Sequence, residues 1–526
     1  HPEGQPSGPP LVLGQVFWDG PGNVLRTIDQ EGYELRYTHD DIDRPLTVTF
    51  PDGSYQQVIY DRLFPGWTRD RSGRWSQTLR NSLMQVVATR DAAGNVTNYA
   101  WCRCGALKGL TDPNGGRTSW NFNIKGQATD KIYPDGTKIV FEFDPDSGDL
   151  TKATDPKGRI AKLERNLDGS MRRVLIYASA ADLTANTPAL TTSWDYNTDP
   201  QFILGALSAI NGPEGRTEFS YFPITNDDPE TPESEYTRNA GRLMGIDLPG
   251  ANDFGFDYDD VMGTATWTLA GKSETVRIDR YGRSRSLTNP LGTWNWQYVG
   301  GTPTIPGASG RVSSILGGPN GNFPMLFAYH GIAKDLLPSR MTGGFNPTAT
   351  LDGGTMINDY DYDQDRQISQ WSISHRSVFS GLPDMSANGM QSAAVWSFKQ
   401  DRVGQLVSAL RTAGSCLAAV KQSNLYDPSG NPLARQNGAE VVFRTFNNLN
   451  QITQDGANHG RVRVEGRLDE PGTVSIDGKP AAVSGDLSFS GDAELAPGDD
   501  TIAVTAEDFH GNKKPQNWKL DVVAGT

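Results

Sequence analysis

The feature that most constrains this chain is a turn that recurs at nearly constant intervals. Glycines in Asp- or Pro-rich turns follow one another every 20 to 22 residues, and a second series lies out of phase with the first. The first series is Gly32, Gly53, Gly73, Gly94, Gly115, Gly136 and Gly158, and the second is Gly105, Gly126, Gly148 and Gly169. A turn about every 10 or 11 residues predicts strands of about seven or eight residues joined into consecutive hairpins.

Between these turns, apolar and polar residues alternate. In "KIVFEFD", residues 138–144, Ile139, Phe141 and Phe143 share one face of a strand. Period two indicates a half-buried strand, so residues 15–178 are predicted to form antiparallel hairpins with connections of about 2–5 residues and no long helix. The turns require a positive φ at their glycines, which we expect at Gly53, Gly115, Gly136, Gly158 and Gly169.

Composition agrees with an all-β fold. The chain has 526 residues, with 58 Gly and 33 Pro for turns and 12 Trp, 17 Tyr and 20 Phe for packing. Its net charge of −14 argues against nucleic acid or an anionic membrane as the main partner. No apolar run approaches the roughly 20 residues of a membrane span, so membrane insertion is not expected.

An aromatic-x-aromatic phrase precedes many of the turns. We interpret these residues as a structural wall, because a binding site would concentrate them in one place, and we expect them to be mostly buried against neighbouring strands. The alternative is a set of platforms that stack on sugars. The residues chosen as repeat aromatics are Tyr99, Trp101, Trp120, Phe122, Phe141, Phe143, Trp294, Trp296, Tyr360 and Tyr362.

The repeated phrases resemble the YD repeats of the Rhs family, whose relatives include the C components of insecticidal toxin complexes and teneurins. They include "FEFDPDSGDL", "LTDPNGGRTSW", "YDYDQDRQI" and "LYDPSGNPL", and they run over roughly residues 15 to 455. The resemblance implies a sheet that spirals into a barrel or hollow cocoon around a cargo. No segment here matches the self-cleaving aspartyl core of the polymorphic-toxin members.

Four regions are expected along the chain. Residues 1–14 form an N-terminal extension, 15–178 the regular hairpins, and 179–457 an irregular repeat region with loop insertions. Residues 458–526 contain six or seven short alternating strands with turns at Pro471-Gly472, Asp477-Gly478 and Pro497-Gly498. This last region resembles immunoglobulin-like modules of the glucodextranase type, which predicts a small β-sandwich. The start at His1 suggests a processed or excised piece.

Other chemistries are less well supported by the residues. Asp361, Asp363 and Asp365 have the first spacings of a calcium loop, but Arg366 and Ser372 stand where Gly and Glu are required. Cys102 and Cys104, placed on one face of a predicted strand, are interpreted as buried inert thiols rather than as a strained disulfide or, with Cys416, an incomplete zinc site. No nucleophile elbow or His-Glu-x-x-His is present, so no catalytic, metal or cofactor residue is predicted.

The sequence therefore predicts a non-enzymatic, extracellular or cell-surface scaffold that forms a shell with other segments of its own protein or with a partner chain. The resemblance carries much of this expectation. A carbohydrate-binding adhesin with a glycan as partner is the second hypothesis. A glycan-active enzyme with an unrecognised pair of carboxylates is the third.

Overall fold

The fold is taken from a computed structural model of the chain. It describes residues 14–224, 239–250, 253–259, 263–279, 282–300, 309–318, 323–344, 355–376, 390–412, 419–438, 440–457, 459–495 and 501–522.

The regular repeat region contains sixteen strands and no helix. They are β1 (Gly14–Trp18), β2 (Val24–Asp29), β3 (Glu34–His39), β4 (Pro45–Thr49), β5 (Tyr55–Asp61), β6 (Phe64–Arg69), β7 (Trp75–Arg80), β8 (Val86–Arg90), β9 (Val96–Trp101), β10 (Leu107–Thr111), β11 (Arg117–Phe122), β12 (Ala128–Ile132), β13 (Lys138–Phe143), β14 (Leu150–Thr154), β15 (Ile160–Arg165) and β16 (Met171–Tyr177).

The described residues of the irregular region form a short helix, one 3₁₀ helix and twenty further strands. They are α1 (Ala180–Ala185), β17 (Leu190–Tyr196), β18 (Leu207–Gly212), β19 (Gly215–Tyr221), β20 (Leu243–Asp247), β21 (Phe254–Asp259), β22 (Thr264–Leu269), β23 (Lys272–Ile278), β24 (Ser284–Asn289), β25 (Gly292–Tyr298), β26 (Val312–Gly317), β27 (Phe323–Tyr329), η2 (Ile332–Lys334), β28 (Pro338–Gly344), β29 (Thr355–Tyr362), β30 (Ile368–Arg376), β31 (Met390–Gln400), β32 (Leu406–Arg411), β33 (Val420–Tyr426), β34 (Pro432–Asn437), β35 (Glu440–Phe446) and β36 (Ile452–Ala457).

The C-terminal region contains eight strands among the described residues, and seven of them form two small sheets. They are β37 (Gly460–Arg467), β38 (Gly472–Ile476), β39 (Lys479–Pro480), β40 (Ala482–Val483), β41 (Ser488–Leu495), β42 (Thr501–Asp508), β43 (Lys513–Lys519) and β44 (Asp521–Val522). One sheet has the order β37-β41-β40 and the other β39-β38-β42-β43. Strand β44 leaves this pair of sheets and lies parallel to β35 in the main sheet.

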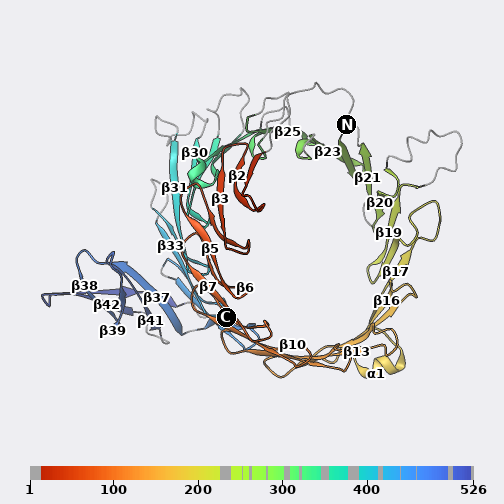
Figure 1. Ribbon diagram of the computed structural model, residues 1–526, viewed down its shortest axis with the longest axis horizontal. Coiled ribbons are helices and arrows are strands. Elements are labelled where there is room, and N and C mark those ends of the chain that lie inside the picture. The colour runs from red at the N-terminus through yellow and green to blue at the C-terminus, as the bar shows by residue number, and fades with distance from the viewer. Residues whose placement is uncertain are drawn as a thin grey trace.

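Among the described residues the main sheet has 37 strands. Strands β1 to β36 form one meander in which each pairs antiparallel with the next, and β44 joins this sheet beside β35. Among the described residues β1 pairs only with β2, and β36 only with β35, so the sheet stays open at both ends. The sheet curls into a ring that passes over its own beginning, and the C-terminal sheets lie outside the ring (Figure 1). The predicted barrel or cocoon therefore takes the form of an open spiral.

A five-residue turn builds this repeat, and the turn after β14 shows how. The Asp155 carboxylate accepts hydrogen bonds from the backbone N–H of Lys157 (2.9 Å) and Arg159 (2.8 Å). The backbone N–H of Gly158 donates to the carbonyl of Asp155 at 3.0 Å, and the Gly158 φ of 81° is in the left-handed region. The carboxylate thus satisfies backbone donors that the tight turn leaves without a partner in the ladder.

The hairpin prediction for residues 15–178 is confirmed with two adjustments. Gly53, Gly115, Gly136, Gly158 and Gly169 all have the expected positive φ, between 81° and 88°. The connections run from two residues, Arg62 and Leu63, to six residues, 144–149. The strands have five to seven residues, shorter than predicted, because most turns take five residues of each interval.

Most of the main sheet is a single layer. Its own buried cluster is small: Ile160, Leu175 and Tyr177, covered by Leu183 of α1. The larger core joins the two C-terminal sheets to the strands β34 and β35, and it contains Phe443, Val441, Val464, Ile476 and Ile502 among others. Among the described residues, no helix is long and apolar enough to cross a membrane.

Candidate functional site

The strand register places the repeat aromatics on one face of the main sheet. Directly opposed residues of paired strands lie on the same face, and Tyr360, Trp371 and Trp396 oppose one another in succession across β29, β30 and β31. On β34 and β35 the opposite face carries Ala434 and Phe443, which pack against the C-terminal sheets outside the ring. The aromatic face is therefore the inner face, which surrounds the lumen.

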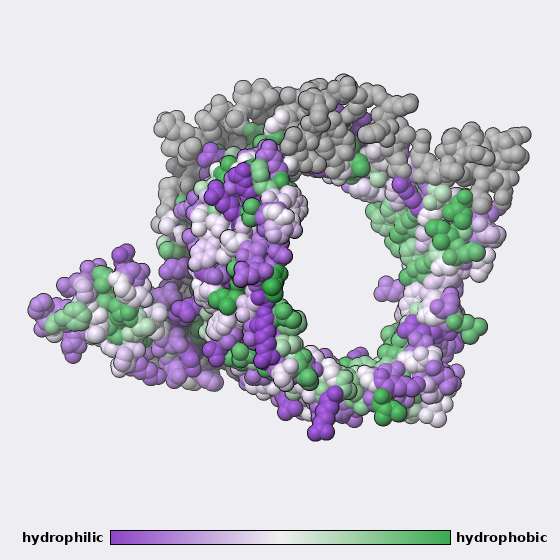
Figure 2. Space-filling view, viewed as in Figure 1, coloured by the Kyte–Doolittle hydropathy of each residue, from purple (hydrophilic) through white to green (hydrophobic). Residues whose placement is uncertain are grey.

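The assignment of the aromatic residues to the inner face holds for the whole spiral. Following opposed residues from strand to strand shows that all ten repeat aromatics face the lumen, as do Trp194, Phe219, Phe256, Phe327 and Phe398. Helix α1 packs on the opposite, outer face through Leu183. The space-filling view shows an open aperture through the ring, with hydrophobic residues gathered along its edge near β19 and β20 (Figure 2).

In two repeats, a tyrosine is tied to the turn of the preceding hairpin. Arg283 pairs with Asp279 (2.6 Å) in the turn before β24, and its guanidinium lies 3.9 Å over the ring of Tyr298. The Tyr298 hydroxyl donates to the carbonyl of Ser284 at 2.7 Å, and burial raises the pKa of this phenol. The Tyr-Asp, glycine and Arg positions of the repeat thus form one interlocked unit.

The same unit occurs near the N-terminus. Asp40 pairs with Arg44 (2.6 Å), and Arg44 lies 4.0 Å over the ring of Tyr60. The Tyr60 hydroxyl donates to the carbonyl of Pro45 at 3.0 Å. Two copies more than 200 residues apart show that the repeated phrase encodes a structural clamp between neighbouring hairpins.

The expectation that the repeat aromatics are mostly buried holds only in part. All ten are half-buried and none is fully buried, and the residue opposite Phe141 on β14 is Ala153 rather than another ring. A single-layer sheet has no second layer to cover its inner face, so each ring is covered only by neighbours on its own face. Rings also stack along a strand, as Trp396 and Phe398 do with centroids 6.4 Å apart.

Where the spiral passes over its own beginning, turns from the two ends of the main sheet contact one another. We call this contact the seam; it joins turns between residues 31 and 137 to turns between residues 311 and 451. Its hydrogen bonds join residues 264 to 338 positions apart in the sequence. Examples are Asn114 to Asp427 at 2.8 Å and Asn448 to the carbonyl of Pro134 at 3.0 Å. One revolution of the sheet therefore takes about 300 residues.

A buried charge network stands at one end of the seam. Asp335, with a side chain 6% exposed, accepts hydrogen bonds from Arg71, Tyr33 and Arg366. Arg71, only 5% exposed, also pairs with Asp52 at 2.9 Å. Because these three residues from distant turns share one carboxylate, the network fixes how one coil sits on the other.

The network shifts the ionisation of its members. Burial works to raise the pKa of Asp335, but hydrogen bonds from Arg71, Tyr33 and Arg366 outweigh it and hold this pKa below its usual value. Burial and the hydrogen bond to Asp335 raise the pKa of Tyr33 to about 12. Asp335 is therefore the anion and Tyr33 the neutral donor at neutral pH.

Sequence reasoning did not find the seam. Asp335 lies outside any repeat phrase, at the end of η2, with a φ of 57°. Arg71 occupies an ordinary turn position between Asp70 and Gly73. No spacing within the sequence indicates which of two turns 264 residues apart will meet.

The carboxylates of the three aspartates with calcium-like spacing pair with basic side chains or accept a backbone hydrogen bond. Asp361 pairs with Lys334 (2.6 Å), Asp363 caps its own turn through the N–H of Gln367 (2.9 Å), and Asp365 pairs with Arg74 across the seam (2.5 Å). Within the described part of the chain, no group of three or more His, Cys, Asp or Glu residues could hold a metal ion. Cys416, the distant member of the possible zinc set, lies outside the described residues.

The interpretation of Cys102 and Cys104 as two buried thiols is wrong. They form a disulfide, and they lie in the five-residue turn between β9 and β10 rather than on a strand. The turn brings residues two apart close enough to bond, with Cα atoms 5.2 Å apart. Cys104 is exposed and Cys102 half-buried.

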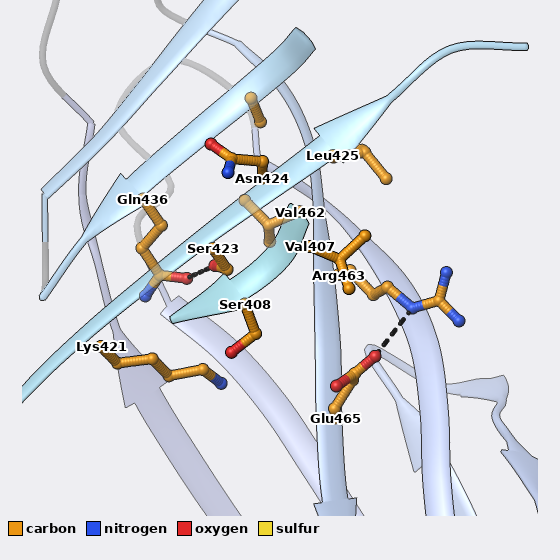
Figure 3. A pocket seen from close by; sticks show the side chains of 11 residues that line it. Val407, Ser408, Lys421, Ser423, Asn424, Leu425, Gln436, Val462, Arg463 and Glu465 are labelled. Carbon is orange, nitrogen blue, oxygen red and sulfur yellow. Dashed lines mark hydrogen bonds and ion pairs between the residues drawn. The ribbon is translucent and has the colours of Figure 1, made fainter. Parts of the chain in front are cut away.

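Two hollows accompany the outer face of the sheet. One lies between β33 and β37 and is lined by Lys421, Ser423, Arg463 and Glu465 among others, with Arg463 and Glu465 paired at 3.2 Å (Figure 3). Its volume of about 20 Å³ leaves room for little more than a water molecule. The other is an open hollow of about 480 Å³ over β28 to β30, where Arg340 pairs with Asp359 at 2.5 Å.

Comparison with known proteins gives sequence relatives and solved structures. No protein-family model matches the chain. It is 24% identical over 439 residues to double-stranded DNA deaminase toxin A of Burkholderia cenocepacia, a match that spans 73% of this chain and 28% of the relative. The chain thus spans less than a third of that protein.

Among solved structures, the chain is similar to TcdB2-TccC3 without its hypervariable C-terminal region. The TM-score is 0.48 at 11% identity, over 96% of this chain and 29% of the other. The Tc holotoxin pore of Photorhabdus luminescens gives a TM-score of 0.45 at 12% identity, over 96% of this chain and 28% of the other. Both comparisons again cover less than a third of the larger chain.

Proposed function

We propose that this chain is a non-enzymatic segment of a hollow, Rhs-type shell, within a longer toxin-related protein that is secreted or displayed outside the cell. One observation carries the proposal: the sheet turns past a full revolution around an open aperture and docks on itself at the seam. A single-layer wall that is sealed by its own turns can enclose a volume without a solid core. The YD-type phrases and the toxin among the sequence relatives support the same function.

The partners of this sheet are proposed to be other segments of the same protein, or a second chain, that complete the shell. The inner face is the surface toward the enclosed cargo, since the half-buried aromatic rings point there. The relative named a deaminase toxin supports a place for this segment within a toxin, and the activity in its name is a property of that protein.

The C-terminal sheets are proposed to be an immunoglobulin-like module attached to the outside of the shell. Two sheets of three and four strands share one core, and that core continues into β34 and β35 through Phe443, which is 2% exposed. The shared core fixes the module to the wall, so it is suited to serve as an external buttress or as a contact surface.

The glycan-binding hypothesis is less well supported by the ring environments. Sugar stacking needs an open ring face, whereas arginines lie over Tyr60, Tyr298 and Tyr329 at 3.9–4.9 Å. Catalysis is also proposed to be absent, because carboxylates such as Asp155, Asp335 and Asp363 serve turns and ion pairs. A glycan array and an assay for released sugars test these two alternatives directly.

The shell proposal is tested by protease protection in the full-length parent protein. Segments enclosed by an intact shell should resist trypsin, and Arg71→Ala should remove that resistance by weakening the seam. Arg216→Ala is the matched control, since it breaks an exposed ion pair, with Asp195 at 2.6 Å, away from the seam. Equal digestion of the native and Arg71→Ala proteins, with every segment accessible in both, would overturn the proposal.

A further inference from the structure

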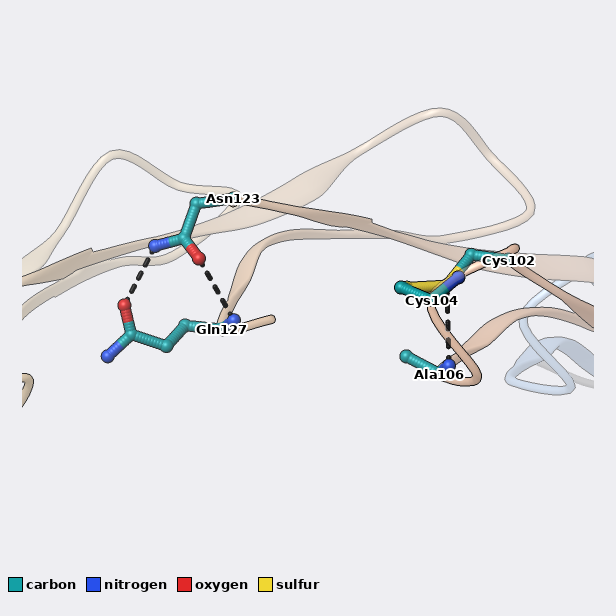
Figure 4. The surroundings of a disulfide bond; sticks show 5 residues. All are labelled: Cys102, Cys104, Ala106, Asn123 and Gln127. Atoms are coloured by element: carbon teal, nitrogen blue, oxygen red, sulfur yellow. Dashed lines mark hydrogen bonds between the residues drawn. A yellow bond between two sulfur atoms is a disulfide. The ribbon is translucent and has the colours of Figure 1, made fainter. Parts of the chain in front are cut away.

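The turn that contains the disulfide follows the same plan as its neighbours, with sulfur in the place of an oxygen. In the next turn on the same edge of the sheet, Asn123 accepts from the N–H groups of Lys125 and Gln127, both at 3.0 Å. Cys102 occupies the equivalent first position, and its Sγ accepts from the N–H groups of Cys104 (3.0 Å) and Ala106 (3.3 Å). Figure 4 shows the two turns together.

The two sulfurs of this disulfide therefore have different surroundings. Cys102 is half-buried and points at two backbone donors, whereas Cys104 is exposed and lies at the tip of the turn. A nucleophile from solvent can reach Cys104 Sγ, and Cys102 Sγ is the atom placed to receive the electron pair. Thiol–disulfide exchange is fastest when the leaving sulfur is the better stabilised thiolate.

Other turns of this chain show that the first residue of the turn is stabilised in its charged form by the hydrogen bonds it accepts. In the turn of the C-terminal module, hydrogen bonds from the side chain and the backbone of Asn512 lower the pKa of Asp508 below its usual value. In the turn after β13, backbone N–H groups of Ser147 and Asp146 lower the pKa of Asp144. Hydrogen bonds to an ionised acceptor are stronger than those to a neutral one. A thiolate in the same cradle is stabilised in the same way.

We propose that the Cys102–Cys104 turn is a thiol-exchange site, at which an external low-molecular-weight thiol adds to Cys104 and Cys102 leaves as the thiolate. The incoming thiolate sulfur forms a bond to Cys104 Sγ, the Cys102–Cys104 bond breaks, and its electron pair remains on Cys102. A second thiol can then displace Cys104 from the mixed disulfide and release the oxidised small disulfide, so that both cysteines are reduced by two electrons in total.

The turn keeps its cap throughout this cycle, because Cys102 accepts the same two N–H groups as a disulfide sulfur and as a thiolate. Arg103 is the one ionisable residue within the turn besides the cysteines. Arg103 follows Cys102 directly, and its positive charge favours the thiolate form.

The first test maps the mixed disulfide. The native protein carrying Cys416→Ser is treated briefly with glutathione, quenched with acid, blocked with N-ethylmaleimide and analysed by peptide mass spectrometry. We expect glutathione on Cys104 and maleimide on Cys102 in at least about tenfold excess over the reverse arrangement. The same chain unfolded in guanidinium is the control, and its adducts should divide nearly evenly. Equal adducts in the native protein, or an excess on Cys102, would overturn the proposal.

The second test measures the two thiols singly. In the Cys416→Ser background, Cys104→Ser leaves Cys102, and Cys102→Ser leaves Cys104. The pH midpoint of iodoacetamide alkylation for Cys102 should lie at least about one pH unit below that for Cys104, which should be near the ordinary thiol value of about 8.5. Circular dichroism checks that both variants are folded. Coincident midpoints in folded variants would contradict a stabilised thiolate at Cys102.

Discussion

The main sheet and the C-terminal module are both all-β, yet they are held together differently. In the module, two sheets enclose Val474, Ile476 and Ile502, each at most 3% exposed. In the wall, the repeat aromatics are half-buried, and large apolar residues such as Ile59 and Leu79 are 46% exposed. The module buries a core between two sheets, whereas the wall is one strand layer thick over most of its length.

The difference shows that a long sheet can be specified without a continuous core. Its order comes from three local devices: the backbone ladder, the carboxylate or amide cap of each turn, and the arginine that clamps a tyrosine of the next hairpin. The seam then adds contacts between distant turns. Each device is small, and their number along the sheet compensates for the missing second layer.

The largest expected effect tests the contrast between the two regions directly. Phe443→Ala removes a ring that is 2% exposed from the core shared by wall and module, and it should cost about 3–5 kcal/mol of unfolding free energy. Phe141→Ala removes a half-buried ring from the wall and should cost about 2 kcal/mol, since less apolar area returns to water. Urea unfolding of both variants measures this. Equal losses would show that the wall is as well packed as the module.

Breaking the seam should have the next largest effect. Arg71→Ala leaves Asp335 buried with fewer partners, and we expect a loss of about 3 kcal/mol, the lower end for a broken buried ion pair, because Tyr33 and Arg366 remain. Arg216→Ala, which breaks an exposed pair, should cost less than about 1 kcal/mol. If the two variants unfold at the same urea concentration, the seam does not stabilise the spiral.

The turn glycines should give a smaller and more local effect. Gly136→Ala places a side chain at a φ of 83°, and we expect a loss of about 1 kcal/mol although the space around it is open. Gly20→Ala is the control, because Gly20 has open space and its φ lies outside the left-handed region. Thermal unfolding that is unchanged by Gly136→Ala would argue against strain as the reason for glycine at this position.

Alkaline pH should weaken the seam through Tyr33. The pKa of Tyr33 is raised to about 12 from 10, so its contribution to stability is complete below pH 10 and is lost as the pH rises toward 12. The lowered pKa of Asp335 matters at acid pH. The contribution of its charged form to stability is present above about pH 4 and is lost as the pH falls further. Unfolding of native and Tyr33→Phe proteins between pH 9 and 12 should converge. Parallel curves would exclude Tyr33 as the titrating group.

The local structure of the wall could be predicted from the sequence, because its information is short-range. Alternation around Phe141 and the glycine interval defined the hairpins, and the positive φ of Gly136 followed from turn chemistry. The burial of Phe141 could not be predicted in this way. Period two shows that one face differs from the other, but only the packing shows whether a second layer covers it.

What the sequence determined by itself was the repeat, and with it the all-β meander, since each hairpin depends on residues fewer than about 25 positions apart. What only the tertiary structure decided was that the aromatic faces point into the lumen, that Arg71 meets Asp335, and that β44 returns to β35. The physical reason is that each strand pair adds a small twist and bend to the sheet. The sum of these rotations over one revolution decides which distant turns come together.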